Sequence, residues 1–384
     1  MFFIRQAQPD DASTLLKLAK MVHFINLPAD PDIISRRIAQ SRLSFDGKAR
    51  KKRERVFMFV LEDSDTGNVV GTSSIVACIS WPGRPHTFLQ VRKREFFSQD
   101  LQTGQVHLTL QLGTDESGPS EIGGLILGPS YRGHSLRLGA FLSLVRFHFM
   151  GLNRKSFSDR VLAEMMGPLT PDSRNLLWEY LGRRFINLQY AEADRFCQHS
   201  KEFITSLFPR EEIYVSLLPP EARALIGRVG PETEPARAML EGLGFRYHGQ
   251  IDPFDGGPYL EAVIDEIPLV KSTRTATLSE RSGPFPDEGM ISAAGEFGYR
   301  AVRTNYALEG DAIGISPEYV ELLGIKPGAS VGVTPLKTPS AESDNPAVMA
   351  APQRERAPGE RTPEERTPRQ RDRSSASGPQ KVTE

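Results

Sequence analysis

The chain has 384 residues, which is enough for two or three domains with a large core. Lysine and arginine total 47 against 48 aspartates and glutamates. The resulting net charge of −1 does not indicate any particular class of partner, nucleic acids included. No apolar run approaches the roughly 18 residues of a membrane span, and the N-terminus lacks the apolar core of a signal peptide. Cys78 and Cys197 are the only cysteines, which fits a reducing compartment. We therefore expect a cytoplasmic protein without a membrane or nucleic-acid partner.

Hydrophobic spacing predicts alternating strands and helices along most of the chain. The first half predicts a strand over 2–7, a helix beginning after Asp10 or Asp11, strands over 56–61, 69–76, 106–112 and 121–127, and a helix over 138–150. The second half predicts strands over 161–165, 213–217 and 245–249 and helices over 175–182, 203–207, 220–226 and 235–243. Residues 273–289, rich in Ser, Thr, Pro and charge, are typical of an exposed linker.

The segment from Glu121 to Gly139 is the most informative part of the sequence. An apolar strand ends there, an arginine- and glycine-rich turn follows, and an apolar helix begins. The first N–H groups of a helix lack partners and carry partial positive charge, so such a turn suits a phosphate. Arg132 and Arg137 can each offer a planar guanidinium to a pyrophosphate. An ordinary strand-turn-helix connection is the alternative interpretation.

This turn resembles the pyrophosphate-binding turn of the GNAT superfamily of N-acyltransferases, Arg/Gln-x-x-Gly-x-Gly/Ala, although Ser135 and Arg137 occupy positions usually held by small residues. The resemblance implies a binding site for the pyrophosphate and pantetheine of an acyl-CoA. Its predicted residues are Leu125, Leu127, Arg132, Gly133, His134, Arg137 and Gly139. The order of strands and helices along the chain is also that of the GNAT fold.

Shorter segments in a shared order resemble one family within that superfamily, the arginine N-succinyltransferases. They lie at 26–30, 72–75, 162–165, 178–185, 192–194, 213–218, 226–229, 235–237, 244–247, 251–258 and 316–333. The Phe-Asp-Gly-Gly-Pro run at 254–258 is the most specific of them. The resemblance implies transfer of a succinyl group from succinyl-CoA to the α-amine of arginine. Two histidines of the family are replaced in this chain. Gly230 stands in place of the histidine expected as proton donor, and Glu116 stands in place of the other.

Acyl transfer to an amine requires a donor for the oxyanion and a group that accepts a proton. Two adjacent glycines in the strand before the turn predict a β-bulge that exposes an N–H, and we assign the oxyanion to Gly124; close strand packing is the alternative. Glu116, beside Asp115, and Glu121, at the start of the strand, are the candidates for proton transfer, because adjacent carboxylates can raise each other's pKa. A plain turn over 115–118 explains the first pair equally well.

Arginine as a substrate needs carboxylates for its guanidinium. Asp115, Glu164, Asp252 and Asp255 are the candidates, although Asp255 could equally cap the turn at Gly256. No cysteine and histidine spacing indicates a metal, and the chemistry needs no permanently bound cofactor.

These observations predict a mixed α/β fold with a GNAT-like acyltransferase core over 1–272 and the linker over 273–289. A small all-β subdomain over 290–337 and a disordered tail over 338–384 follow. The expected partners are an acyl-CoA and arginine or a related amine, with self-association into a homo-oligomer. Two alternatives stay open: a sister enzyme that uses another acyl donor or amine, and a catalytically silent CoA-binding protein.

Overall fold

A mixed β-sheet organises the part of the chain that the computed structural model describes, residues 1–21, 27–197 and 200–336. These residues fall within one compact unit, Met1–Thr338, and the predicted tail over 338–384 lies outside the described residues. The strand order is β12-β15-β11-β14-β13-β1-β2-β3-β6-β7-β10-β9-β4-β5-β8. All pairs are antiparallel except β6 with β7 and β11 with β14.

The strand bounds agree with most of the predicted strands. The strands are β1 (Phe2–Gln6), β2 (Val56–Asp63), β3 (Asn68–Val76), β4 (His86–Ser98), β5 (Thr103–Asp115), β6 (Ser120–Leu127), β7 (Arg160–Glu164), β8 (Ile213–Tyr214), β9 (Arg246–Ile251), β10 (Pro258–Val263), β11 (Arg274–Leu278), β12 (Asp287–Gly295), β13 (Gly298–Glu309), β14 (Ala312–Ile315) and β15 (Ser330–Pro335). The sequence prediction omitted β4 and β10 and extended β8 to 217, where a 3₁₀ turn over Val215–Leu217 takes its place.

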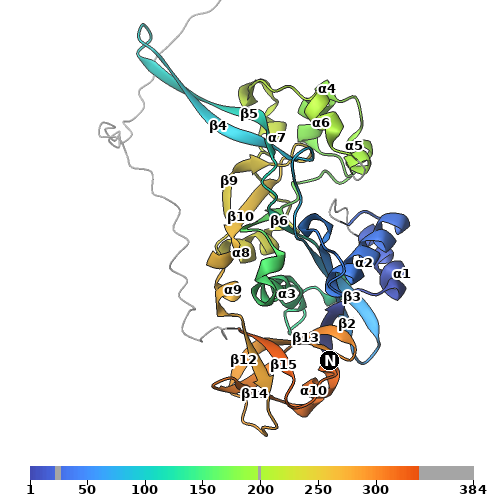
Figure 1. Ribbon diagram of the computed structural model, residues 1–384. Coiled ribbons are helices and arrows are strands. Elements are labelled where there is room, and N and C mark those ends of the chain that lie inside the picture. The colour runs from blue at the N-terminus through green and yellow to red at the C-terminus, as the bar shows by residue number, and fades with distance from the viewer. Residues whose placement is uncertain (22–26, 198–199, 337–384) are drawn as a thin grey trace, which may run out of the picture. The chain divides into compact units, whose positions relative to one another are not determined.

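Helices cover both faces of the central strands (Figure 1). They are α1 (Ala12–Met21), α2 (Pro31–Phe45), α3 (Leu138–Leu152), α4 (Arg183–Phe185), α5 (Tyr190–Cys197), α6 (Glu202–Leu207), α7 (Pro220–Arg223), α8 (Glu234–Gly242), α9 (Pro268–Ser272) and α10 (Pro317–Leu323). The helix predicted over 175–182 contains a π-helical turn, Trp178–Gly182, built around the buried Trp178 indole. The prediction missed α2, whose N-cap is Asp30.

Strand β2 is apolar at every position from 56 to 61 because both of its faces are buried. Phe57, Phe59 and Leu61 join the core beneath α3, whereas Val56, Met58 and Val60 join a second core beneath α1 and α2. A strand buried on both faces has a continuous apolar run, in place of the alternation of a half-exposed strand. This two-sided core holds the central strands rigidly in the middle of the sheet.

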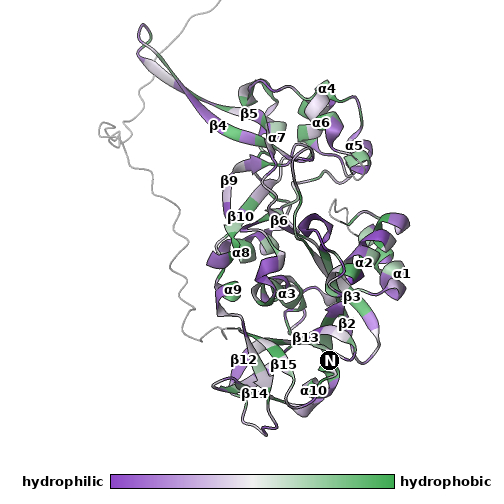
Figure 2. Ribbon diagram, viewed as in Figure 1, coloured by the Kyte–Doolittle hydropathy of each residue, from purple (hydrophilic) through white to green (hydrophobic). Residues whose placement is uncertain are grey.

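The hairpin of β4 and β5 is paired from His86 with Asp115 out to Ser98 with Thr103. It projects from the rest of the described chain (Figure 1), and its outer part mixes hydrophobic and hydrophilic residues (Figure 2). Leu101 and Phe97 are exposed there. Periodicity could not find β4 because no face of its outer half is buried, so its side chains are not selected to alternate.

The segment over 273–289 is not a linker. It contains β11, which pairs with β14 and β15, and it includes the start of β12. Only Ala276 and Leu278 of β11 are buried, so the apolar signal is too short to recognise in the sequence. The strands that follow form a small β-rich core, which joins the main sheet where β13 pairs with β1.

A buried histidine links α3 to the C-terminal strands. His148 contacts Thr334 Oγ1 through Nδ1 and Ser292 Oγ through Nε2, both at 2.6 Å. Burial lowers the pKa of His148 to about 3. The folded protein therefore keeps this ring neutral at a pH where the unfolded chain, with a histidine pKa near 6.5, binds a proton.

Replacing His148 by glutamine should flatten the acid side of the stability curve. Between about pH 6.5 and 3 the unfolded state binds the extra proton, so this residue removes up to about 1.4 kcal/mol of unfolding free energy per pH unit as the pH falls. Urea unfolding of wild type and His148→Gln at several pH values measures the difference in slope. His107→Gln, on the partly exposed hairpin, is the control and should keep the wild-type slope; equal slopes in wild type and His148→Gln would contradict the prediction.

Candidate active site

Strands β6 and β7 pair over only three residues and then separate. The parallel pairing runs from Ser120 with Val161 to Ile122 with Ala163. Beyond it, β7 ends at Glu164 while β6 continues to Leu127. Within the described residues, this outer part of β6 has a strand partner only on its β3 side. Its free edge is open to a ligand that pairs like an added strand.

A β-bulge lies where the two strands separate. On β3, Ser74 pairs with Gly123 and Thr72 with Ile126, so Gly124 and Leu125 together oppose the single residue Ser73. Gly124 has φ +59°, and a Cβ there would lie 3.0 Å from Ser74 Oγ. A side chain at this position would be strained, which explains the glycine. The predicted bulge is therefore present, next to the end of β7.

A cavity of about 770 Å³, here called the turn cavity, follows the free edge of β6 to the glycine-rich turn. Ten of the predicted site residues line it: Gly124, Leu125, Leu127, Arg132, Gly133, His134, Arg137, Gly139, Glu164 and Asp255. The predicted donor-binding residues thus come together in one cavity. Other parts of its wall come from α8 and from Arg146 of α3.

Left-handed residues shape the glycine-rich turn. Gly133 has φ +71°, and Arg137, the N-cap of α3, has φ +52°. The Leu136 N–H donates to His134 Nδ1 at 3.1 Å, so one nitrogen of that ring is used within the turn. Arg132 is exposed and lies 3.3 Å from the Glu232 carboxylate. The helix N-terminus and these cations give the turn the features of an anion site.

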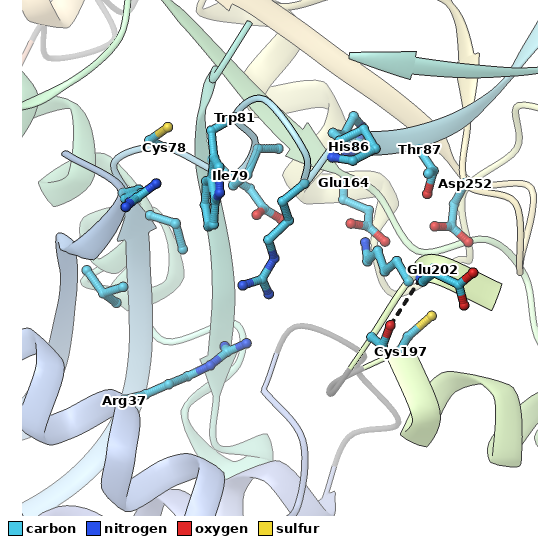
Figure 3. Close-up of a pocket in the computed structure, with 18 of the residues that line it drawn as sticks. Arg37, Cys78, Ile79, Trp81, His86, Thr87, Glu164, Cys197, Glu202 and Asp252 are labelled. Atoms are coloured by element: carbon cyan, nitrogen blue, oxygen red, sulfur yellow. Dashed lines mark hydrogen bonds between the residues drawn. The ribbon is translucent and has the colours of Figure 1, made fainter. Parts of the chain in front are cut away.

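A second cavity of about 810 Å³, here called the charged cavity, has Glu164, His86 and Asp252 among its lining residues (Figure 3). Its charged lining residues are Arg37, Arg53, Arg84 and Lys201 on the positive side and Glu121, Glu164, Asp194, Glu202 and Asp252 on the negative side. Among the described residues, Glu164 alone lines both cavities. Its carboxylate therefore marks the place where the two cavities approach each other.

The carboxylates of the charged cavity perturb one another. Burial raises the pKa of Glu164 well above its usual value, the charges of Asp252, Glu121 and Asp255 raise it further, and Lys201 opposes them. Burial also raises the pKa of Glu121, against Lys201 and Arg37. The pKa of Lys201 is raised by the acidic groups, chiefly Glu164, even though burial lowers it. Strongly shifted groups that line a cavity are typical of a functional site.

Asp252 and Asp255 mainly hold the turn between β9 and β10. Asp255 accepts the Gly257 N–H at 2.7 Å and the Gly167 N–H at 2.9 Å. Asp252 accepts the N–H groups of Phe254 and Asp255 and the Tyr259 hydroxyl. The capping role that the sequence left open for Asp255 is thus present in the structure.

Asp115 and Glu116 do not form the predicted carboxylate pair at the site. Asp115 ends β5 and forms an ion pair with Arg160 at 2.8 Å. Burial raises its pKa, but hydrogen bonds from Ser117 and Arg160 outweigh that effect and hold the pKa below its usual value. Glu116 is exposed and accepts the Gly83 N–H at 2.9 Å. Asp115 pairs with Arg160 and not with its sequence neighbour Glu116, because opposite charges in contact attract each other whereas two carboxylates repel.

Sequence reasoning missed His86, Lys201 and Asp194 as lining residues of the charged cavity. His86 Nε2 and Thr87 Oγ1 are buried without a hydrogen-bond partner among the described residues, and burial lowers the pKa of His86 to about 3. Burial, aided by Asp252, raises the pKa of Asp194 to about 6. His86 lies in a stretch without periodicity. Asp194 belongs to one of the segments that carry the family resemblance, which was the available signal.

The described residues contain no cluster of three or more potential metal ligands. In the same residues, none of the helices combines the length and the apolarity needed to cross a membrane. Gly230, where the resemblance implies a histidine, donates its N–H to Met166 O at 3.0 Å. A Cβ there would lie 3.5 Å from Gly167 O, so a side chain could be accommodated.

Removing the Asp255 carboxylate should destabilise the protein. Asp255→Ala leaves two buried N–H groups without an acceptor, and we expect a loss of about 2–4 kcal/mol in the free energy of unfolding. Denaturant unfolding measures it. Asp172→Ala, at an exposed carboxylate, is the control and should change stability by less than about 0.5 kcal/mol. A loss no larger than that of the control would show that Asp255 does not hold this turn.

Sequence comparison with known proteins identifies relatives over most of the chain. A family model described as the arginine N-succinyltransferase beta subunit matches residues 2–269. The arginine N-succinyltransferase of Enterobacter sp. (strain 638) is 38% identical over 291 residues, covering 75% of this chain and 83% of that protein. The arginine N-succinyltransferase of Yersinia pestis (strain Pestoides F) is 34% identical over 353 residues, covering 89% of this chain and 100% of that protein.

A solved structure, subunit AI of the arginine/ornithine succinyltransferase of Pseudomonas aeruginosa, is similar with a TM-score of 0.74 and 28% identity. It covers 88% of this chain and 99% of that chain. The predicted GNAT-like acyltransferase fold and the family resemblance are thereby confirmed. The chain belongs to the arginine N-succinyltransferase family of acyl-CoA-dependent N-acyltransferases.

Proposed function

We propose that this chain transfers the succinyl group of succinyl-CoA to the α-amine of arginine. The observation that carries the proposal is the meeting of two cavities at Glu164, beside the bulge at Gly124. The turn cavity suits the CoA part of the donor, with its pyrophosphate at the N-terminus of α3 and its pantetheine along the free edge of β6. The charged cavity suits an acceptor that carries both signs of charge.

The bulge supplies the oxyanion donor in this scheme. The amine nitrogen attacks the thioester carbonyl carbon, and the carbonyl oxygen becomes negative in the tetrahedral intermediate. A backbone N–H at Gly124 is fixed by the sheet before the reaction, so it stabilises that charge without reorganising. The intermediate then collapses with cleavage of the carbon–sulfur bond, and CoA leaves as its thiolate.

Glu164 accepts the proton that the amine loses. The amine must be neutral to attack, and a free α-amine titrates near 7.7 to 8.0, so a carboxylate with a raised pKa is a sufficient base. Glu164 replaces Glu116 in this role because only Glu164 lies where the cavities meet. Glu121 lines the charged cavity next to it and supports the binding of a cation.

The acceptor's charges match the lining of the charged cavity. Asp194, Glu121 and Asp252 provide negative charge for a guanidinium, whereas Arg53 and Arg84 provide positive charge for the α-carboxylate. His86 and Thr87 add two buried polar atoms that lack hydrogen-bond partners in the part of the chain that the structure describes. Buried polar atoms without partners are costly unless a ligand or water satisfies them.

The experiment that tests this function is the release of free thiol from succinyl-CoA by the purified protein, with and without arginine. Acetyl-CoA is the comparison donor, and ornithine and lysine are comparison acceptors. Release that requires arginine and prefers succinyl-CoA is the expected result. Release with another donor or amine favours the sister-enzyme alternative, and CoA binding without release favours the catalytically silent one.

Replacing Glu164 by glutamine should reduce kcat by about 100-fold or more, because the loss of a general base typically costs that amount. CoA binding, measured by calorimetry, should stay within a few-fold of wild type. Glu116→Gln is the matched control at the other candidate carboxylate and should keep nearly full activity. A large loss of kcat in Glu116→Gln together with nearly full activity in Glu164→Gln would show that Glu116 is the base.

Replacing Lys201 by methionine should shift the acid limb of the kcat/KM profile to higher pH. Lys201 opposes the rise in the pKa of Glu164, so its removal raises that pKa, and the base is deprotonated only at a higher pH. A pH series from 5 to 9 measures the shift. Lys271→Met, at an exposed lysine, should leave the limb in place. An acid limb that moves down in Lys201→Met would contradict this assignment of Glu164.

The state of the cysteines supports a location. Both cysteines, Cys78 and Cys197, are free, which supports a reducing cytoplasm.

The β4–β5 hairpin supports self-association, because it exposes apolar side chains that include Phe97 and Leu101. Light scattering of wild type against Phe97→Ser tests this self-association: a lower molar mass in the variant supports it, and a monomeric wild type contradicts it.

A further inference from the structure

An arginine in the middle of α3 is buried without a charged partner. Arg146 is 3% exposed and lines the turn cavity. Its Nε donates to Ser143 O at 2.9 Å, and one terminal nitrogen donates to Ser143 Oγ. A guanidinium has five N–H donors, so three have no hydrogen-bond acceptor among the described residues, where its other contact is the Phe147 ring, 5.8 Å from Cζ to the ring centroid. Among the same residues, no carboxylate forms an ion pair with it, and burial alone lowers its pKa to about 9.

A buried cation without a partner is costly to the folded state. Removing a guanidinium from water is compensated only by a counter-charge or a full set of hydrogen bonds. Ser143 belongs to the same helix and supplies two acceptors without negative charge. The remaining donors lie at the wall of a cavity that is large enough for a ligand. The arrangement is therefore that of an anion-binding group whose anion is not among the described residues.

The position of Arg146 along the cavity distinguishes two possible anions. Arg137 and Gly139 lie at the start of α3 beside the glycine-rich turn, and Ser143 and Arg146 continue the same cavity-lining face. Eight residues separate Leu138 from Arg146, or about 12 Å along the helix. On β6, which leads into the turn, Gly124 lies three residues before Leu127, or about 10 Å. Arg146 is thus level with the bulge, at the far end of the cavity from the site proposed for the pyrophosphate.

We propose that Arg146 binds the free carboxylate of a dicarboxylic acyl donor and selects succinyl-CoA over neutral acyl-CoAs. This inference rests on the proposed function and names the side chain that recognises the acyl group of the donor. A planar guanidinium matches a carboxylate with two parallel hydrogen bonds. Arg132 and Arg137 are left for the phosphates at the turn. A neutral acyl group of the same length leaves Arg146 unpaired, and a site with an unpaired polar group discriminates strongly against that ligand.

The test compares succinyl-CoA with butyryl-CoA, in which a methyl group replaces the carboxylate. Arginine-dependent thiol release by the full-length protein gives kcat/KM for each donor and the ratio between them. Arg146→Met should lower the succinyl-to-butyryl ratio by about 100-fold or more. Because the ratio compares two donors on one preparation, partial misfolding does not change it. Arg146→Lys, which keeps the charge but not the planar geometry, should lower the ratio less.

Two controls locate the effect. Arg132→Met, at the glycine-rich turn, should weaken both donors alike and leave the ratio at its wild-type value. Lys201→Met tests whether the acyl carboxylate instead reaches across to the charged cavity. A ratio that falls in Lys201→Met and not in Arg146→Met overturns the inference, as does a ratio within a few-fold of wild type in Arg146→Met. A wild-type protein that uses both donors equally contradicts the proposed succinyl transfer itself, which keeps the two failures apart.

Discussion

The separation of β6 from β7 is the constraint on which the site depends. Two parallel strands that stay paired leave no room between them, and here pairing stops after Ile122 and Ala163. The bulge at Gly124 bends β6 at that point, and β7 ends at Glu164. One local irregularity therefore provides an open strand edge and a carboxylate that lines two cavities. The two-sided core around β2 buries both faces of the neighbouring central strand.

Charge is distributed unevenly between the two cavities. The charged cavity contains both signs close together, so its carboxylates and Lys201 shift one another's pKa values. The turn cavity has Arg132 and Arg137 at the glycine-rich turn and Arg146 further along α3, and its carboxylates are Glu164, Glu232 and Asp255. Its cations therefore lie on the turn and on α3, whereas Glu164 is shared with the charged cavity.

The candidate carboxylates for proton transfer lie in different surroundings. Glu116 accepts the Gly83 N–H at the surface. Glu164 and His86 line the charged cavity, and Glu164 also lines the turn cavity. Proton transfer depends on distance and pKa and not on chain order, so the fold decides which carboxylate can reach a ligand.

The sequence by itself determined the elements whose signal is local. The turn from Gly128 to Gly139, the helix that follows and the Gly123–Gly124 bulge were predicted because glycine positions and apolar spacing depend only on nearby backbone geometry. The residues predicted to bind the donor lie on that turn and the strand before it, and they line one cavity. The β4 strand and β11 were missed because their stability comes from partners distant in the chain.

Only the tertiary structure decided which charged residues meet. Asp115 looked like a partner for Glu116, but Arg160 on β7 forms an ion pair with it. Asp255 is a predicted substrate ligand, but backbone N–H groups of Gly167 and Gly257 occupy its two oxygens. Lys201, His86 and Glu164 are far apart in sequence and line one cavity. Electrostatic interactions act through space over a few ångströms, so the sequence lists the charged groups while the fold determines their partners.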